Sequence, residues 1–173
     1  MRFLGPRSIS SLLKTALDVV YYGLFVIIAV IVLAAMCFLV VPNLAAEMAR
    51  KLSLAPNLSA TSQALILLAF AVSLSLYLLI THWIRQVFST LAESNAFHID
   101  NTRRLRWIGF GLAAVEILNY AGRALVVNVL HLHAEPFYGV RAVTAWFSVL
   151  VVFVLAEVFK EGARLRHEAD LTI

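Results

Sequence analysis

The sequence predicts an all-α integral membrane protein: a four-helix bundle that crosses the bilayer four times, with both termini in the cytoplasm. Two observations support this. Of the 173 residues, 62% are hydrophobic and 14% are charged, whereas soluble domains are roughly 45–50% apolar and about 25% charged. The apolar residues also gather in four stretches long enough to cross a bilayer. This composition excludes a soluble globular enzyme, a disordered chain and a nucleic-acid-binding domain, and we expect residues 1–173 to form a single membrane domain.

The first two spans are predicted at residues 19–41 and 64–84. The first is an uncharged run of 23 residues, and about 20 helical residues cross a hydrocarbon core. Pro42 ends this span because proline cannot continue a helix. The run exceeds the roughly 7–15 apolar residues of a cleaved signal peptide, so we expect a permanent anchor. After the second span, the segment 85–106 is expected to be cytoplasmic and amphipathic.

The third and fourth spans are predicted at residues 107–130 and 142–159. The third carries Glu116 and Arg123, and the fourth is uncharged until Glu157. Short polar side chains favour helix N-termini, and the candidates to cap the third helix are Asp100, Asn101 and Thr102. Small residues let membrane helices approach closely, and we expect this of Gly109, Gly111, Ala113 and Gly122.

The Lys and Arg residues predict the orientation. Ten of them lie in the N-terminal tail, in segment 85–106 and in the C-terminal helix and tail 160–173, and three lie on the other side. Because basic residues gather in cytoplasmic loops, both termini are predicted to be cytoplasmic. The expected location is the bacterial cytoplasmic (inner) membrane, which the chain crosses as a multi-pass protein.

Two segments resemble a known family. They comprise Asn95-Ala96-Phe97, Asn101 and the run from Arg104 to Gly109, and then the run from Leu155 to Leu165, Glu168 and the ending Asp170-Leu171-Thr172-Ile173. With four spans, this pattern resembles a bacterial membrane family known only as domain of unknown function twenty-nine seventy-five. Ala96 departs from it, because the family often has proline there. Members are often encoded beside a small helix-turn-helix regulator, so the resemblance implies a membrane-bound regulator of a transcription factor and implies no catalytic residues.

A polar stripe runs along the third span. Its members fall at i, i+3, i+4 and i+7, on one helix face, and are Glu116, Asn119, Tyr120 and Arg123. An ionised residue at mid-span costs about 2.5–3.5 kcal/mol on insertion scales. The stripe is therefore expected to face other helices or water. Polar partners for Glu116 are expected on neighbouring helices, at Ser73, Tyr77, Thr144 and Ser148. Two interpretations remain: a proton- or ligand-sensitive site, or a structural contact between helices.

A second candidate surface lies on the predicted cytoplasmic face. It comprises Arg103, Arg104, Arg106, Glu157, Lys160, Glu161, Arg164, Arg166 and Asp170. Glu157–Lys160 and Glu161–Arg164 are expected to attract each other at i, i+3. The surface fits either topology signals that bind anionic lipid or a docking site for a cytoplasmic protein.

Catalytic and metal-binding motifs are missing from the sequence. The five histidines have no convincing ligand spacing, and there is no HExxH motif or phosphate loop. Cys37 is the only cysteine, so no intramolecular disulfide can form. We therefore expect no enzymatic activity, no cofactor and no metal.

These observations favour a non-enzymatic membrane regulator that binds or sequesters a cytoplasmic transcription regulator, with no direct contact to nucleic acid. One alternative is an immunity or stress-protection protein against a membrane-active toxin. Another is a small transporter that uses Glu116. Because most transporters have more spans or duplicated halves, that alternative requires a homo-oligomer.

Overall fold

The computed structural model describes residues 9–41, 43, 47, 59–92, 98–128 and 140–171. Four long α-helices contain nearly all of them. These are α1 (Ile9–Val40), α3 (Ala60–Ala92), α4 (Ile99–Asn128) and α5 (Val140–Asp170). No strand occurs among the described residues. The predicted all-α fold with four membrane-length helices is confirmed.

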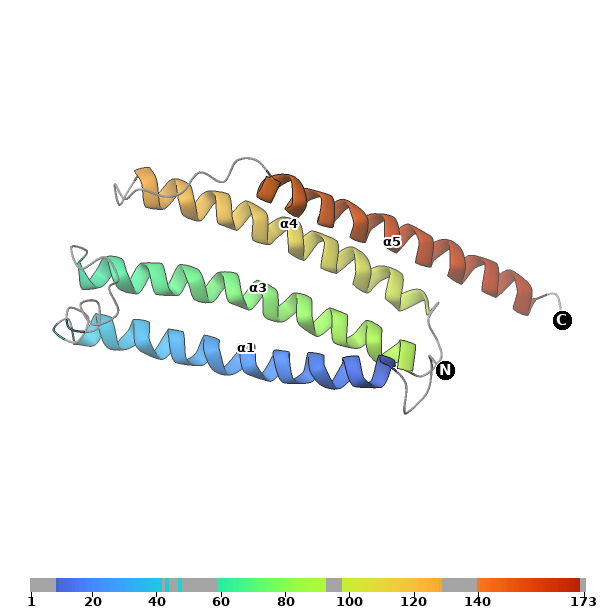
Figure 1. The fold of residues 1–173 in the computed structure, drawn as a ribbon, viewed down its shortest axis with the longest axis horizontal. Coiled ribbons are helices and arrows are strands. Elements are labelled where there is room, and N and C mark those ends of the chain that lie inside the picture. Colours follow the sequence, from blue (N-terminus) through green and yellow to red (C-terminus); the bar gives the residue numbers. More distant parts are fainter. Residues whose placement is uncertain are drawn as a thin grey trace.

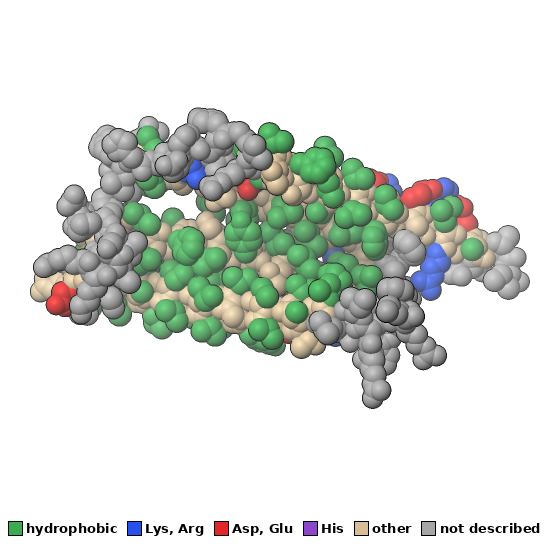
Figure 2. Space-filling view, in the orientation of Figure 1, with side chains coloured by type: hydrophobic (Ala, Val, Ile, Leu, Met, Phe, Trp, Pro, Cys, Tyr) green, Lys and Arg blue, Asp and Glu red, His purple; other side chains and the backbone are tan. Residues whose placement is uncertain are grey.

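All four helices are long and apolar enough to cross a membrane. Many large apolar side chains lie exposed on them, including Val19, Phe25, Phe147 and Val154. Figure 2 shows hydrophobic side chains spread over most of the visible helical surface. Such a surface is unfavourable in water and suits hydrocarbon. These features are those of a multi-pass membrane protein.

The helices lie side by side in chain order and run alternately up and down (Figure 1). α1 contacts α3, α3 contacts α4, and α4 contacts α5; in the described part of the chain no other helix pair is in contact. The beginnings of α1 and α4 and the ends of α3 and α5 lie at one end of the molecule. We call this the charged end, and the basic residues predict that it is cytoplasmic.

The apolar core lies between α3 and α4. Its buried members are spaced seven residues apart on each helix, as Ile80 and Val87 on α3 and Ile108 and Val115 on α4. A spacing of seven returns to the same helix face after two turns. The core therefore forms one seam along the two central helices.

Two glycines allow α4 to approach its neighbours. A Cβ atom on Gly111 would lie 2.8 Å from Cγ1 of Ile80 on α3, and one on Gly109 would lie 3.1 Å from the Phe153 ring on α5. Both predictions of close approach are confirmed. Gly122 has no such neighbour within 4 Å among the described residues, so the prediction for this glycine is wrong for the described part of the chain.

The structure gives α4 a different N-terminal cap from the one predicted. The helix begins at Ile99, so the three predicted capping residues lie inside it. His98 precedes the helix, and its Nδ1 accepts a hydrogen bond from the backbone N–H of Asp100 at 3.2 Å. Its backbone oxygen accepts another from the N–H of Asn101 at 2.9 Å. An imidazole nitrogen thus replaces the expected hydroxyl, amide or carboxylate oxygen.

Candidate functional site

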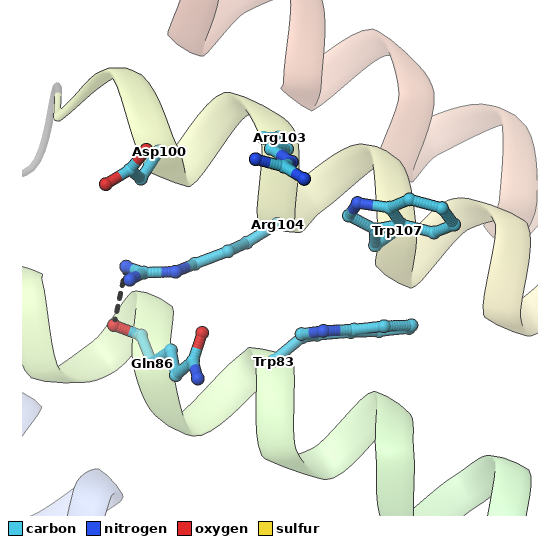
Figure 3. A pocket seen from close by; sticks show the side chains of 6 residues that line it. All are labelled: Trp83, Gln86, Asp100, Arg103, Arg104 and Trp107. Atoms are coloured by element: carbon cyan, nitrogen blue, oxygen red, sulfur yellow. Dashed lines mark hydrogen bonds between the residues drawn. The ribbon is translucent and has the colours of Figure 1, made fainter.

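A pocket of about 260 Å³ opens between α3 and α4 at the charged end. It is lined by Trp83, Gln86, Asp100, Arg103, Arg104 and Trp107. Figure 3 shows the two indoles facing one another, with the arginines projecting from α4. The indole centroids are 5.8 Å apart and the ring planes are inclined by 28°. The pocket therefore combines flat apolar walls with cationic groups.

Arg104 crosses from α4 to α3 beside this pocket. Its Nη1 donates to Oδ1 of Asn101 at 3.1 Å and to the backbone oxygen of Gln86 at 3.4 Å. The Gln86 side chain is itself held, since its Nε2 lies 2.9 Å from Nε2 of His82. Arg104 is thus fixed by groups from both helices.

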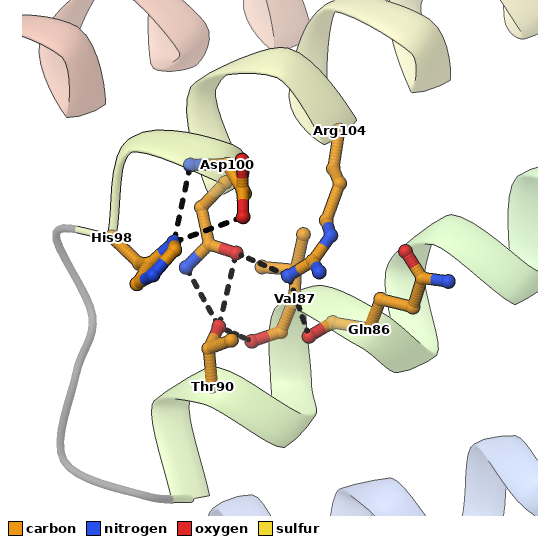
Figure 4. Close-up of polar contacts among 7 residues, drawn as sticks. Gln86, Val87, Thr90, His98, Asp100 and Arg104 are labelled. Atoms are coloured by element: carbon orange, nitrogen blue, oxygen red, sulfur yellow. Dashed lines mark hydrogen bonds and ion pairs between the residues drawn. The ribbon is translucent and has the colours of Figure 1, made fainter.

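Asn101 is the centre of a polar network, since it bonds both Thr90 and Arg104; Figure 4 shows Thr90 on α3 and Arg104 on α4 on either side of it. Its side chain is fully buried, and its Nδ2 donates to Oγ1 of Thr90 at 2.7 Å. The Thr90 hydroxyl also donates to the backbone oxygen of Val87 at 2.8 Å. Because a buried amide must keep its hydrogen bonds, this network fixes the register of α4 on α3. The sequence pattern did not indicate Thr90 or Gln86, and it suggested only a capping role for Asn101.

A second polar contact joins α1 to α3. Nε of Arg85 donates to Oδ1 of Asp18 at 2.5 Å, and the arginine and aspartate side chains are 23% and 33% exposed. The guanidinium carbon of Arg85 lies 4.5 Å from the Tyr21 ring centroid, within cation–π range. Lys14 Nζ donates to Ser89 Oγ at 3.3 Å on the same pair of helices. The sequence indicated Arg85 only as an orientation charge.

Glu116 lies at mid-span on α4 without the expected partner. Its Oε2 is buried and has no hydrogen-bond partner among the described residues. Ser73 and Ser148 donate to backbone oxygens of their own helices, at Ala69 and Thr144. The expected contacts of Ser73 and Ser148 with Glu116 are therefore wrong, because each hydroxyl donates its single hydrogen within its own helix.

The rest of the polar stripe follows α4 away from the charged end. Asn119 and Arg123 are partly buried and Tyr120 is exposed. Oε2 of Glu116 accepts no hydrogen bond from Arg123 or from any other described residue.

The family comparison covers most of this architecture. A family model described as "Protein of unknown function (DUF2975)" matches residues 43–173. The chain belongs to this family. The match includes α3, α4 and α5, with the pocket and the Asn101 network. Searches of curated proteins and of solved structures gave no match.

In this DUF2975 chain the predicted cytoplasmic surface divides into two parts. Arg106 Nη2 donates to Oε1 of Glu157 at 2.6 Å, which joins α4 to α5. Lys160 donates to the other oxygen of Glu157 at 3.3 Å. Further along α5, Arg164 forms ion pairs with Glu161 and Glu168.

The two predicted attractive pairs, Glu157–Lys160 and Glu161–Arg164, are confirmed. Arg166 is exposed on α5. The Asp170 side chain lies outside the described part of the structure, although α5 ends at this residue. Arg103 is exposed and makes no hydrogen bond or ion pair with the described residues.

Metal-binding groups are not assembled in the described part of this DUF2975 chain. No set of three or more His, Cys, Asp or Glu side chains is placed to hold an ion there. Cys37 is a free, exposed thiol on α1. The pocket and the Asn101 network supply charged, aromatic and hydrogen-bonding groups at the charged end.

Proposed function

We propose that this protein is a non-enzymatic membrane regulator that binds a cytoplasmic DNA-binding regulator and releases it in response to a membrane signal. The observation that carries this proposal is the projecting end of α5, residues 160–170. α5 continues past the predicted span and extends beyond the beginning of α4 (Figure 1). At 1.5 Å per residue, this segment carries side chains about 16 Å past the predicted span.

The projecting end has the composition of a docking surface. Leu165 is 54% exposed and lies among the ion pairs of Arg164 with Glu161 and Glu168. Leu171, directly after α5, is 75% exposed. Interfaces commonly surround apolar contacts with a polar, charged rim. Exposed ion pairs within one helix contribute little to stability, so a partner can exchange them at little cost.

The position of α5 supports a link to the membrane. Among the described helices α5 contacts α4 alone. At the charged end these helices are joined by Arg106 and Glu157. A change in the bilayer that shifts α5 along α4 would therefore move the docking surface. The identity of the partner as a helix-turn-helix regulator rests on the family resemblance.

Site-specific photocrosslinking tests this proposal. A photoreactive amino acid at Leu165 in the full-length protein is expected to capture a small helix-turn-helix protein in native membranes, identified by mass spectrometry. The same probe at Val143, which is exposed at the opposite end of α5, is the matched control and should not capture it. Recovery of no DNA-binding protein at Leu165, together with unchanged transcription after deletion of this protein, would contradict the proposal.

A second candidate function is transport by an oligomer, favoured by the buried, unpartnered Oε2 of Glu116. Ionisable groups inside membranes often belong to ion or proton pathways. Under this candidate, Glu116→Gln abolishes solute or proton flux in proteoliposomes. Equal flux in the variant and the unchanged protein would count against it.

A further inference from the structure

We propose that the pocket between α3 and α4 binds the phosphate group of an anionic phospholipid, with an acyl chain lying along the aromatic side chains next to it. The pocket is lined by two tryptophans, two arginines, a glutamine and an aspartate. This site is separate from the projecting end of α5, and the inference does not depend on the proposed regulatory partner.

The charges of the pocket favour an anion. Arg103 has no hydrogen bond or ion pair with the described residues, and Arg104 donates through Nη1 to Asn101 and to the backbone of Gln86. Against these two guanidinium groups stands the single carboxylate of Asp100, which lies 3.4 Å from Nδ1 of His98. Guanidinium groups present paired N–H donors that match phosphate oxygens. The pocket can therefore take a phosphate with Arg103 as its available cation.

The orientation of Arg104 strengthens this assignment. Its contacts with Asn101 and with the backbone of Gln86 hold the side chain across the gap between the helices (Figure 3). Asn101 is in turn fixed by Thr90. A cation that the protein holds in place loses less conformational freedom when a ligand binds.

Aromatic side chains lead from the pocket along the membrane-spanning part. Trp83 stacks on Trp107. The ring centroids of Trp107 and Phe110 are 6.1 Å apart in an edge-on arrangement, and those of Phe110 and Phe153 are 5.2 Å apart. Trp107 and Phe110 are 47% and 56% exposed. This apolar track runs along α4 from the pocket toward mid-span.

The track distinguishes a lipid from a free phosphate. Tryptophans concentrate where membranes meet water, and an acyl chain can cover Trp107 and Phe110 while its headgroup meets the arginines. Inorganic phosphate would use the arginines and leave the aromatic surface uncovered. A phospholipid with net negative charge is therefore the occupant that uses both parts of the site.

Quenching by brominated lipids tests the proposal on the full-length protein in vesicles. Since the chain has three tryptophans, a Trp146→Phe background leaves Trp83 and Trp107 as reporters. The vesicles contain phosphatidylcholine and phosphatidylglycerol in one fixed ratio. Bromine is placed on the acyl chains of one lipid or the other, at equal mole fraction. We expect phosphatidylglycerol to be enriched beside the indoles by about five-fold, roughly the effect of one arginine at an anionic surface.

Matched variants identify the site. Arg103→Gln removes no contact among the described residues and is expected to abolish most of the enrichment. Arg104→Gln should do the same, with helical content checked by circular dichroism. The control Arg166→Gln removes the same charge from exposed α5 and should retain the enrichment.

Three outcomes would overturn the proposal: equal quenching by the two lipids, full enrichment in folded Arg103→Gln and Arg104→Gln proteins, or an equal loss in Arg166→Gln. A competition experiment adds inorganic phosphate or glycerol phosphate to the vesicles. Persistence of the enrichment supports the lipid, whereas its loss at millimolar soluble phosphate overturns the lipid in favour of a free phosphate.

Discussion

Asn101 shows how one buried amide can position side chains at the charged end of this protein. It joins Thr90 on α3 to Arg104 on α4, and Arg104 lines the pocket. Asparagine near the beginning of a helix is a common cap, so its place in the sequence predicted that role. Its contact with Thr90 depends on how α3 and α4 pack, which a linear pattern does not specify.

We predict that Asn101→Ala destabilises the protein by about 1–3 kcal/mol, because it leaves buried polar groups without a partner. The free energy of unfolding in mixed micelles, titrated with sodium dodecyl sulfate, measures this effect. Asn119→Ala is the control on the same helix, and we expect a change within about 0.5 kcal/mol. Equal losses in the two variants would show that the network does not hold the helices together.

Glu116 shows that a residue's position on a helix can be predicted from sequence while its hydrogen-bond partners cannot. The spacing placed it on a helix long enough to cross a membrane, but Ser73 and Ser148, two of the expected partners, donate their hydroxyls to backbone oxygens of their own helices. Serine in a helix has this local acceptor always within reach. Composition alone cannot show whether a serine hydroxyl donates to this local backbone oxygen or to a residue on a neighbouring helix.

The packing of α3 against α4 depends on Gly111. Both helices carry large side chains along the seam, and the glycine leaves room for Ile80. We expect Gly111→Ala to destabilise the protein by about 1–3 kcal/mol, because Ile80 and the helix must move to accommodate the new methyl group. Thermal unfolding in detergent provides the measurement.

Gly122→Ala is the control for this prediction, since no described neighbour lies within 4 Å of the added atom. It should be neutral or stabilise the helix by up to about 1 kcal/mol, because alanine is the better helix former. In a Gly111→Ala, Ile80→Ala double variant, the loss should be smaller than the sum of the single losses. Additive losses would mean that the two side chains do not meet.

The four helices were predictable because long apolar runs have few alternatives in a bilayer. Their side-by-side contacts were less predictable. Apolar side chains cover most faces of α1, so hydrophobicity does not say which face meets α3. The contact is identified by Asp18 and Arg85, which directly precede the first predicted span and directly follow the second, and which pair only once the helices are placed.

The Asp18–Arg85 pair should therefore contribute to holding α1 on α3. Both side chains are partly exposed, so we expect a coupling energy of about 1–3 kcal/mol, between those of surface and buried pairs. A double-mutant cycle with Asp18→Asn and Arg85→Gln, followed by unfolding in micelles, measures it. The same cycle on the exposed pair Glu161–Arg164 should give no resolvable coupling. Similar values for the two pairs would refute the assigned role.

The chain-order contacts of the four helices have a consequence for biosynthesis. Because each helix packs on the one before it, assembly can proceed while the ribosome is still making the rest of the chain. α4 gains most from this order, since Glu116 and Arg123 make its insertion costly on its own. By the time α4 leaves the translocon, α3 is already in the membrane and presents the surface that receives it.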